Sequence, residues 1–182
     1  AHSMKGYRRY YRRYWPRSNR VKWSSNFAEG TVRLEIPANN TTTTSASVCK
    51  NPVQSVNSVS QPFTTARVTL NIQAVAESAE AAQALGNVKV GIFYVPQGYS
   101  VSNSLFIEHP EWLMGYRFLG EPIIDIAGSS TIMRPFTVAT RLKRRLQTGD
   151  SIVLLIAAYN QSTTTAYSIR FNYTARWWTK AN

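Results

Sequence analysis

Apolar and polar residues alternate with a period of two along most of the chain, a pattern typical of β-strands with one buried face. In the segment 31–36, for example, Val32, Leu34 and Ile36 fall on one face. The run 151–159 is almost entirely apolar and predicts a strand covered on both faces. The predicted strands are 31–36, 63–75, 87–95, 112–119, 135–142, 151–159 and 167–177.

Only the segment 77–85 has a helical pattern, and Gly86 is placed to end that helix. The polar tract 37–62 is too long for a structureless loop. It predicts a further strand around 45–49 or a segment that folds over a neighbouring subunit. The stretch 99–110 also has no clear pattern. Seven or eight strands with one short helix predict an all-β domain, either a sandwich, a jelly roll or a barrel.

Charge divides the 182-residue chain into an arm and a body. The chain has 21 Lys and Arg against 9 Asp and Glu, a formal charge of +12. We interpret residues 1–3, which precede Met4, as a cloning remnant. Residues 4–28 carry eight of the cations and no acid, whereas residues 29–182 hold 13 cations and 9 acids. The sequence therefore predicts a nearly neutral body with a basic N-terminal arm, whose partner is a polyanion.

Within the arm, pairs of cations alternate with pairs of aromatic residues. Guanidinium groups bind phosphates, and aromatic rings stack on unpaired bases, so this combination favours single-stranded over duplex nucleic acid. A basic cluster of this kind also serves as a nuclear import signal. A helix on a membrane surface is not favoured, because Arg and Tyr do not separate into two faces and Pro16 interrupts the segment. The predicted phosphate contacts are Lys5, Arg8, Arg9, Arg12, Arg13, Arg17, Arg20 and Lys22, and the predicted stacking residues are Tyr7, Tyr10, Tyr11, Tyr14 and Trp15.

A second basic cluster consists of Arg141, Lys143, Arg144 and Arg145. In a strand, Arg141, Lys143 and Arg145 would share a face. This cluster is compatible with a solvated or interface surface, a second nucleic-acid contact, or a patch for host glycosaminoglycans. The residues Trp112, Trp177 and Trp178 are interpreted as core or subunit-interface aromatics.

The chain resembles the capsid proteins of circoviruses and related Rep-encoding circular single-stranded DNA viruses. The resemblance lies in the Arg/Tyr-rich leader 4–20, in the apolar strand that closes at 160–162, and in the segment 167–170 that leads to Trp177 and Trp178. It implies an eight-stranded antiparallel jelly roll of two packed four-stranded sheets. It also implies a T=1 icosahedral shell of sixty copies around circular single-stranded DNA. The virion and, during assembly, the host nucleus are the implied locations, with nuclear import receptors as further partners.

Little in the sequence indicates an enzyme. The motif Glu108-His109-Pro110-Glu111 places a histidine between carboxylates, but His2 belongs to the cloning remnant, so no second histidine completes a zinc site, and Pro110 indicates a turn. No Gly-x-Ser-x-Gly elbow and no phosphate-binding Gly-rich loop occur. The single Cys49 excludes an intrachain disulfide. We predict no catalytic residue, no metal, no cofactor and no membrane insertion.

Two other functions are compatible with the same residues. One is the coat protein of an RNA satellite virus, which differs in its cargo. The other is a monomeric cellular β-barrel module that binds single-stranded nucleic acid and does not assemble. Particle size separates the module from either coat protein.

Overall fold

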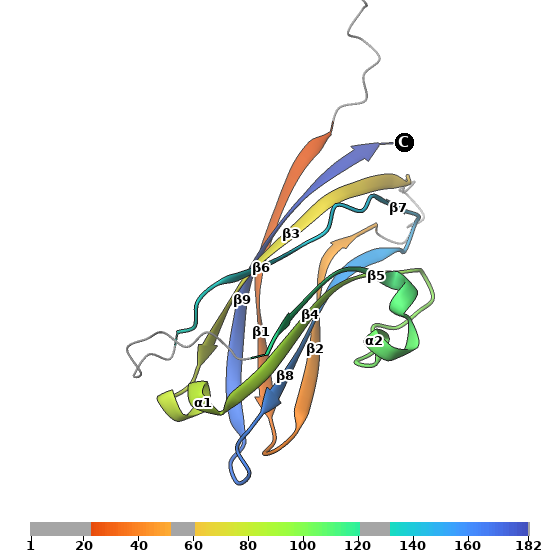
Figure 1. The fold of residues 1–182 in the computed structure, drawn as a ribbon. Helices are drawn as coiled ribbons and strands as arrows, with labels where there is room; N and C mark the ends of the chain where they lie inside the picture. Colours follow the sequence, from red (N-terminus) through yellow and green to blue (C-terminus); the bar gives the residue numbers. More distant parts are fainter. Residues whose placement is uncertain (1–22, 52–60, 121–131, 182) are drawn as a thin grey trace, which may run out of the picture.

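Two antiparallel sheets face each other across an apolar core (Figure 1) in the computed structural model, which describes residues 23–51, 61–120 and 132–181. We name the sheets after a central strand. The β9 sheet has the order β1 (Ser24–Ile36), β9 (Tyr167–Ala181), β3 (Phe63–Ala76) and β6 (Phe136–Ala139), and β7 (Arg144–Leu146) pairs with another part of β3. The β8 sheet has the order β2 (Thr41–Lys50), β8 (Ser151–Asn160), β4 (Leu85–Val95) and β5 (Leu113–Leu119).

The order of the strands is that of a jelly roll. The chain crosses from one sheet to the other after β1, β2, β3, β5, β7 and β8. Among the described strands, β4 and β5 are the only ones that follow each other in the sequence and also pair with each other. The short strands β6 and β7 pair with different parts of β3, and together they fill one edge position of the β9 sheet. Each sheet therefore has four strand positions, and the predicted fold class is confirmed.

The core is formed by the residues that the alternation predicts. On β9, Ile169, Phe171 and Ala175 are buried, and the intervening Arg170 and Arg176 are exposed. Trp177 continues the buried face. The β8 strand is buried on both faces, as its apolar run predicts. Its outward face, with Val153 and Leu155, belongs to a second apolar cluster.

The second cluster depends on the segment between β4 and β5, which the sequence pattern did not resolve. It contains α2 (Leu105–Glu108) and a short 3-10 helix (Pro110–Trp112). Leu105 and the rings of Phe93 and Phe106 pack over β8, and the two rings meet edge to face with centroids 4.9 Å apart. A four-residue helix is held by this packing rather than by its own propensity. The prediction of a single helix was therefore incomplete.

Several predicted boundaries shift. The strand β1 begins at Ser24, so residues 24–28 of the predicted arm belong to the body, where they pair with β9. The strand predicted around 45–49 is confirmed as β2, which begins at Thr41 because four β-branched threonines pair with β8. The helix α1 (Ala79–Ala84) is confirmed, but the expected role of Gly86 is wrong: the chain enters β4 at Leu85, and Gly86 lies within that strand.

A further correction concerns the predicted strand 135–142. Strand structure ends at Ala139 and resumes at Arg144, so residues 140–143 lie outside both β6 and β7. Opposite this break, β3 has a bulge in which Arg67 and Val68 together face Trp177 of β9. Arg67 takes a positive φ of 52°, which is rare for a residue other than glycine. The two irregularities lie at the same level of the sheet, and a bulge bends its strand and increases the local twist.

Candidate nucleic-acid interface

The basic arm joins the body at one end of the sandwich. The predicted contacts between Lys5 and Lys22 lie outside the described residues, which begin at Trp23, directly before β1. The start of β1, the end of β9 and β7 lie together at this end of the molecule (Figure 1), which we call the arm end. The second basic cluster of the sequence therefore lies near the base of the arm.

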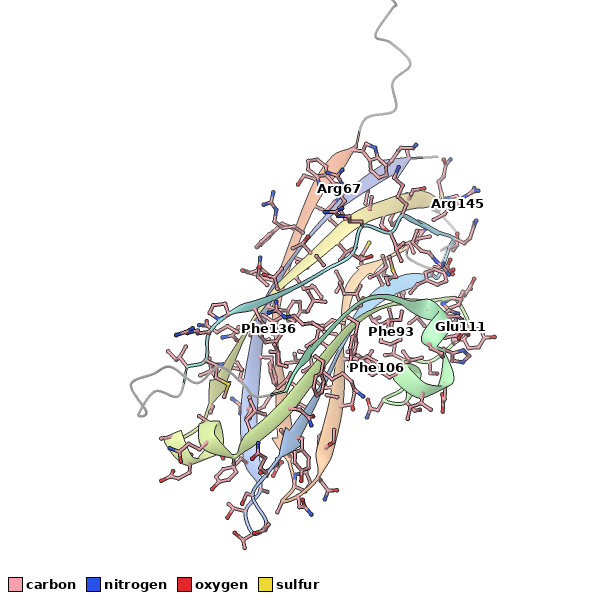
Figure 2. The ribbon with its side chains drawn as sticks, viewed as in Figure 1. Arg67, Phe93, Phe106, Glu111, Phe136 and Arg145 are labelled. Atoms are coloured by element: carbon pink, nitrogen blue, oxygen red, sulfur yellow. The ribbon has the colours of Figure 1, made fainter. Side chains whose placement is uncertain are left out.

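The structure divides that second cluster. Arg141 and Lys143 are exposed in the irregular segment between β6 and β7. Arg145 is exposed opposite Thr64 of β3, and Figure 2 shows it at the arm end together with Arg67. Arg144 lies opposite the fully buried Thr65 and is itself partly buried. Three of the four cations are therefore exposed and can bind a polyanion. The fourth, Arg144, packs against other side chains of the body.

Arg144 packs on the ring of Tyr94, with its guanidinium carbon 3.9 Å from the ring centroid. The hydroxyl of Tyr94 donates a hydrogen bond of 2.6 Å to Oδ2 of Asp150. Burial and the neighbouring carboxylate raise the pKa of Tyr94 to about 12, against the opposing effect of the Arg144 charge. Arg144 therefore stabilises the turn before β8.

Asp150 is the polar centre of the same region. Its side chain is 4% exposed and accepts hydrogen bonds from the backbone N–H groups of Gln97 and Gln147, each 2.9 Å long, in addition to the bond from Tyr94. Its carbonyl accepts a bond from the N–H of Asn51. A buried carboxylate is tolerated when its oxygens are satisfied in this way. The motif 148–150 is therefore a structural turn, and it fixes the segment that presents Lys143 and Arg145.

Cations distant in the sequence extend the basic surface. Arg176 and Lys180 project from β9 on the same outward face as Trp178, as their spacing of two requires. Arg67 joins them from the β3 bulge, and Arg145 from β7. We call this set, with Arg141 and Lys143, the basic face. Its members on β9 could have been grouped from the strand periodicity, whereas Arg67 could not, because only the bulge brings it there.

In the described part of the chain, no acidic residue lies on the segments that carry the basic face, and Glu29 of β1, which pairs with Thr174 two residues before Arg176, lies nearby on the same sheet face. Apart from the buried Asp150, the acids in the described part of the chain lie on β1, next to or within α1, and in the segment around α2; they are Glu29, Glu35, Glu77, Glu80, Glu108 and Glu111. The basic face therefore continues the positive charge of the arm onto a folded surface. Such a surface attracts a polyanion along its whole length.

The histidine motif has a structural role. His109 Nδ1 lies 2.8 Å from Glu111 Oε1, and its ring stacks on Trp112 with centroids 3.8 Å apart. This hydrogen bond lowers the pKa of Glu111. Tyr99 meets both rings edge to face. Within residues 23–51, 61–120 and 132–181, no group of three His, Cys, Asp or Glu side chains is arranged to hold a metal.

The thiol of Cys49 lies against the core. Desolvation raises its pKa from 9.0 to about 11, and the nearby Trp177 indole acts in the opposite direction. Because the thiolate is the reactive species, we expect Cys49 of the folded protein to react with iodoacetamide about a hundredfold more slowly at pH 8 than an unshifted thiol. Mass spectrometry of the native and the guanidinium-unfolded chain measures both rates, and equal rates would contradict this environment.

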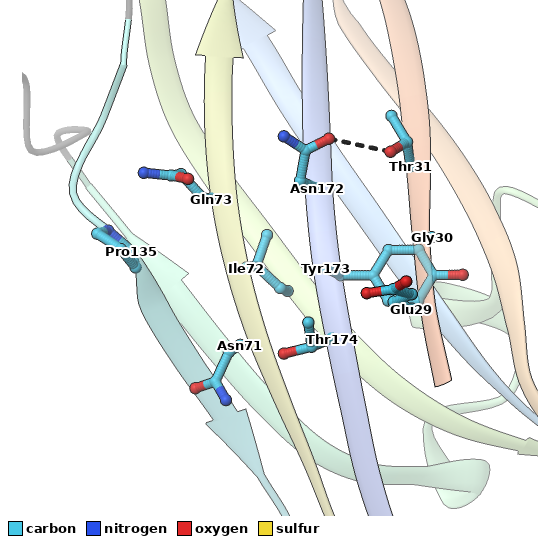
Figure 3. A pocket seen from close by; sticks show the side chains of 10 residues that line it. All are labelled: Glu29, Gly30, Thr31, Asn71, Ile72, Gln73, Pro135, Asn172, Tyr173 and Thr174. Carbon is cyan, nitrogen blue, oxygen red and sulfur yellow. Dashed lines mark hydrogen bonds between the residues drawn. The ribbon is translucent and has the colours of Figure 1, made fainter. Parts of the chain in front are cut away.

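A hollow lies on the outward face of the β9 sheet, lined by residues of β1, β3 and β9 (Figure 3). It has a volume of about 570 Å³. Thr31 donates a hydrogen bond of 3.0 Å to Asn172 across it, and Tyr173 lies against Gly30, where any Cβ would meet the Tyr173 hydroxyl. Among the described lining residues, its carboxylate Glu29 has no Lys, Arg, His or second carboxylate as a partner, and no base activates the hydroxyls there. This arrangement provides neither an acid–base pair nor an activated nucleophile.

Comparisons with known proteins add only distant likenesses. No protein-family model and no curated protein matches the chain. Among solved structures, a chain from the empty head of turnip yellow mosaic virus is 16% identical, with 84% of this chain and 80% of that chain covered, at a TM-score of 0.33. Another turnip yellow mosaic virus chain is 15% identical, with 87% and 95% covered, at a TM-score of 0.32. In the described part of the chain, no helix is long and apolar enough to cross a membrane.

Proposed function

We propose that this chain is a viral coat protein that assembles into a small icosahedral shell, with sixty copies in T=1 symmetry, and packages circular single-stranded DNA through its Arg/Tyr-rich arm. One observation carries the proposal: the basic arm joins a jelly-roll body at the end where the body carries its own basic face. An arm and a folded surface of one sign at one end can hold a polyanion on one side of a shell while the rest of the body contacts other copies.

The same proposal assigns a location and further partners. The arm is rich enough in Arg to act as a nuclear import signal, so assembly takes place in the host nucleus and the product is the virion. Cell-surface glycosaminoglycans are sulfated polyanions and are candidate ligands of exposed cations on the particle.

Exposed apolar side chains support contacts between copies. Tyr116 and Phe118 are 49% and 52% exposed on β5, an edge strand of the β8 sheet, and Ile107 of α2 is 84% exposed. Tyr116 continues an aromatic series through Phe106, whose ring centroid is 6.0 Å away. An exposed edge strand with aromatic side chains promotes association with another molecule. A neighbouring copy in the shell would cover this surface.

We expect Phe118→Glu to prevent assembly without unfolding the chain, because the new carboxylate would have to be buried against an apolar neighbour. The number of assembled particles counted by electron microscopy should decrease at least tenfold, while the circular dichroism spectrum of the chain stays unchanged. The matched control is Gln83→Glu, which adds the same charge on the exposed side of α1. Normal particles from Phe118→Glu would remove β5 from the contacts between copies.

Negative-stain electron microscopy of the purified full chain tests the proposal. Sixty copies of the 20.5 kDa chain amount to about 1.2 MDa and should appear as uniform round particles. Treatment of the extracted cargo with DNase should degrade it, and treatment with RNase should not. A monodisperse protein of about one chain's mass would overturn the coat-protein assignment, and RNase-sensitive cargo would overturn the DNA assignment.

A further inference from the structure

A pocket of about 330 Å³ opens on the outward face of the β9 sheet at the arm end. Its walls are two indole rings and two cations, and its remaining lining residue is small. The lining residues are Trp23, Ala66, Arg67, Lys143 and Trp178. They come from four parts of the chain: the residue before β1, the strand β3, the break between β6 and β7, and the strand β9.

The pocket exists because two strands are irregular at the same level. The β3 bulge inserts Arg67, and residues 140–143 leave the edge position that β6 and β7 otherwise fill. The backbone remains anchored there, since the N–H of Thr140 donates a bond of 2.9 Å to the carbonyl of Val68. Ala66 lies opposite Trp178 in the ladder, and its short side chain leaves space beside the indole. Regular pairing with a larger residue at position 66 would close this hollow.

The pocket combines aromatic rings, which can stack on a nucleobase, with cations, which can bind phosphate groups. The ammonium groups of Lys143 and Lys180 lie 5.6 and 5.5 Å from the centroid of the Trp23 ring. Arg67 is exposed beside them, and the described lining residues of the pocket include no carboxylate. Indole faces stack on nucleobases regardless of the base, and neighbouring cations bind the phosphates on either side. A site for an uncharged apolar ligand would not need three cations at its margin.

We propose that this pocket binds one unpaired nucleotide of a single-stranded nucleic acid. The base stacks against Trp23 and Trp178, and Arg67, Lys143 and Lys180 contact the adjoining phosphates. Paired bases of a duplex are stacked inside the helix and cannot enter. The volume is at the lower end of the range of ligand pockets, about 300–1,000 Å³, which fits one nucleotide rather than a longer segment. The inference rests on the proposed nucleic-acid role but assigns a contact to the body, separate from the arm.

Ultraviolet cross-linking of the full chain to a short oligothymidylate, after nuclease removal of any bound cargo, tests this site. Peptide mass spectrometry then locates the adducts. We expect adducts on the peptides that contain Trp23 and Trp178, in addition to any on residues 4–22. In Ala66→Leu, which fills the pocket without changing the charge, the adducts on the pocket peptides should fall at least tenfold, as expected from the loss of one stacked base. The matched control is Ala166→Leu, an exposed site before β9.

Two further variants separate stacking from charge. Trp178→Ala should lower the affinity for the oligonucleotide about tenfold, and Lys143→Gln should reduce the slope of log affinity against log salt by about 0.7. Adducts confined to residues 4–22 in every variant would overturn the pocket while retaining the arm. A complete absence of adducts would overturn both. If Ala66→Leu weakened only the retention on heparin, the pocket would be a general anion site and the nucleotide assignment would be wrong.

Discussion

Deletion of residues 4–22 is expected to remove nearly all co-purifying nucleic acid while the body stays folded. The deleted segment carries eight cations, and each cation that neutralises a phosphate of a single strand contributes about 0.7 to the slope of log affinity against log salt. The slope should therefore decrease by about 5 to 6. The ratio of absorbance at 260 and 280 nm measures the loss of cargo, and filter binding across a salt series measures the slope.

Two matched variants identify what the arm contributes. An arm of the same length in which every Lys and Arg is replaced by Ser should behave like the deletion. An arm that keeps its cations but has Leu in place of Tyr7, Tyr10, Tyr11 and Tyr14 should keep its salt slope and lose affinity through stacking, by about 1–3 kcal/mol per base contacted. A deleted chain that retained the full cargo ratio would show that the basic face, rather than the arm, holds the nucleic acid.

Substitution of Asp150 should cause the largest loss of stability of any single change considered. Asp150→Ala leaves the Tyr94 hydroxyl and two backbone N–H groups without their acceptor in a region that is nearly inaccessible to water. Because charge-assisted hydrogen bonds contribute about 1.5–3 kcal/mol each and do not add fully, we expect a loss of about 3 to 5 kcal/mol. Urea denaturation followed by tryptophan fluorescence measures this difference.

The control for that change is Glu35→Ala, which removes a carboxylate from an exposed position on β1. It should alter the free energy of unfolding by no more than about 0.5 kcal/mol. In the Asp150→Ala chain, Tyr94 should also titrate at a lower pH than in the unchanged chain, because burial still raises the Tyr94 pKa but the neighbouring carboxylate no longer adds to it. Equal stability of the two variants would show that the turn before β8 does not depend on Asp150.

The strands could be predicted because burial in this fold repeats with the same period as the strand itself. On β1, Leu34 and Ile36 are buried as the alternation requires, and on β9 the same holds for Ile169 and Phe171. The apolar run of β8 predicted burial on both faces. The cover on its outward side, including Leu105 of α2, could not be predicted, because four helical residues have no periodicity to detect and are fixed by tertiary packing.

The basic face and the pocket could be predicted only in part, because tertiary structure rather than sequence spacing brings their residues together. The cations between Arg141 and Arg145 are adjacent in the sequence, yet Arg144 is separated from the others by its contact with Tyr94. Arg67 reaches the basic face through a bulge, and Trp23 reaches the pocket through the pairing of β1 with β9. Such positions depend on the register between strands that are distant in the sequence.

Sedimentation velocity of the full chain, recorded at 260 and 280 nm, tests most directly whether the jelly-roll body and its cationic arm build a container for nucleic acid. The account predicts one fast boundary of about 1.2 MDa of protein plus cargo, with the absorbance of both components moving together. A slow boundary of about 20 kDa, with no moving absorbance from nucleic acid, would contradict it.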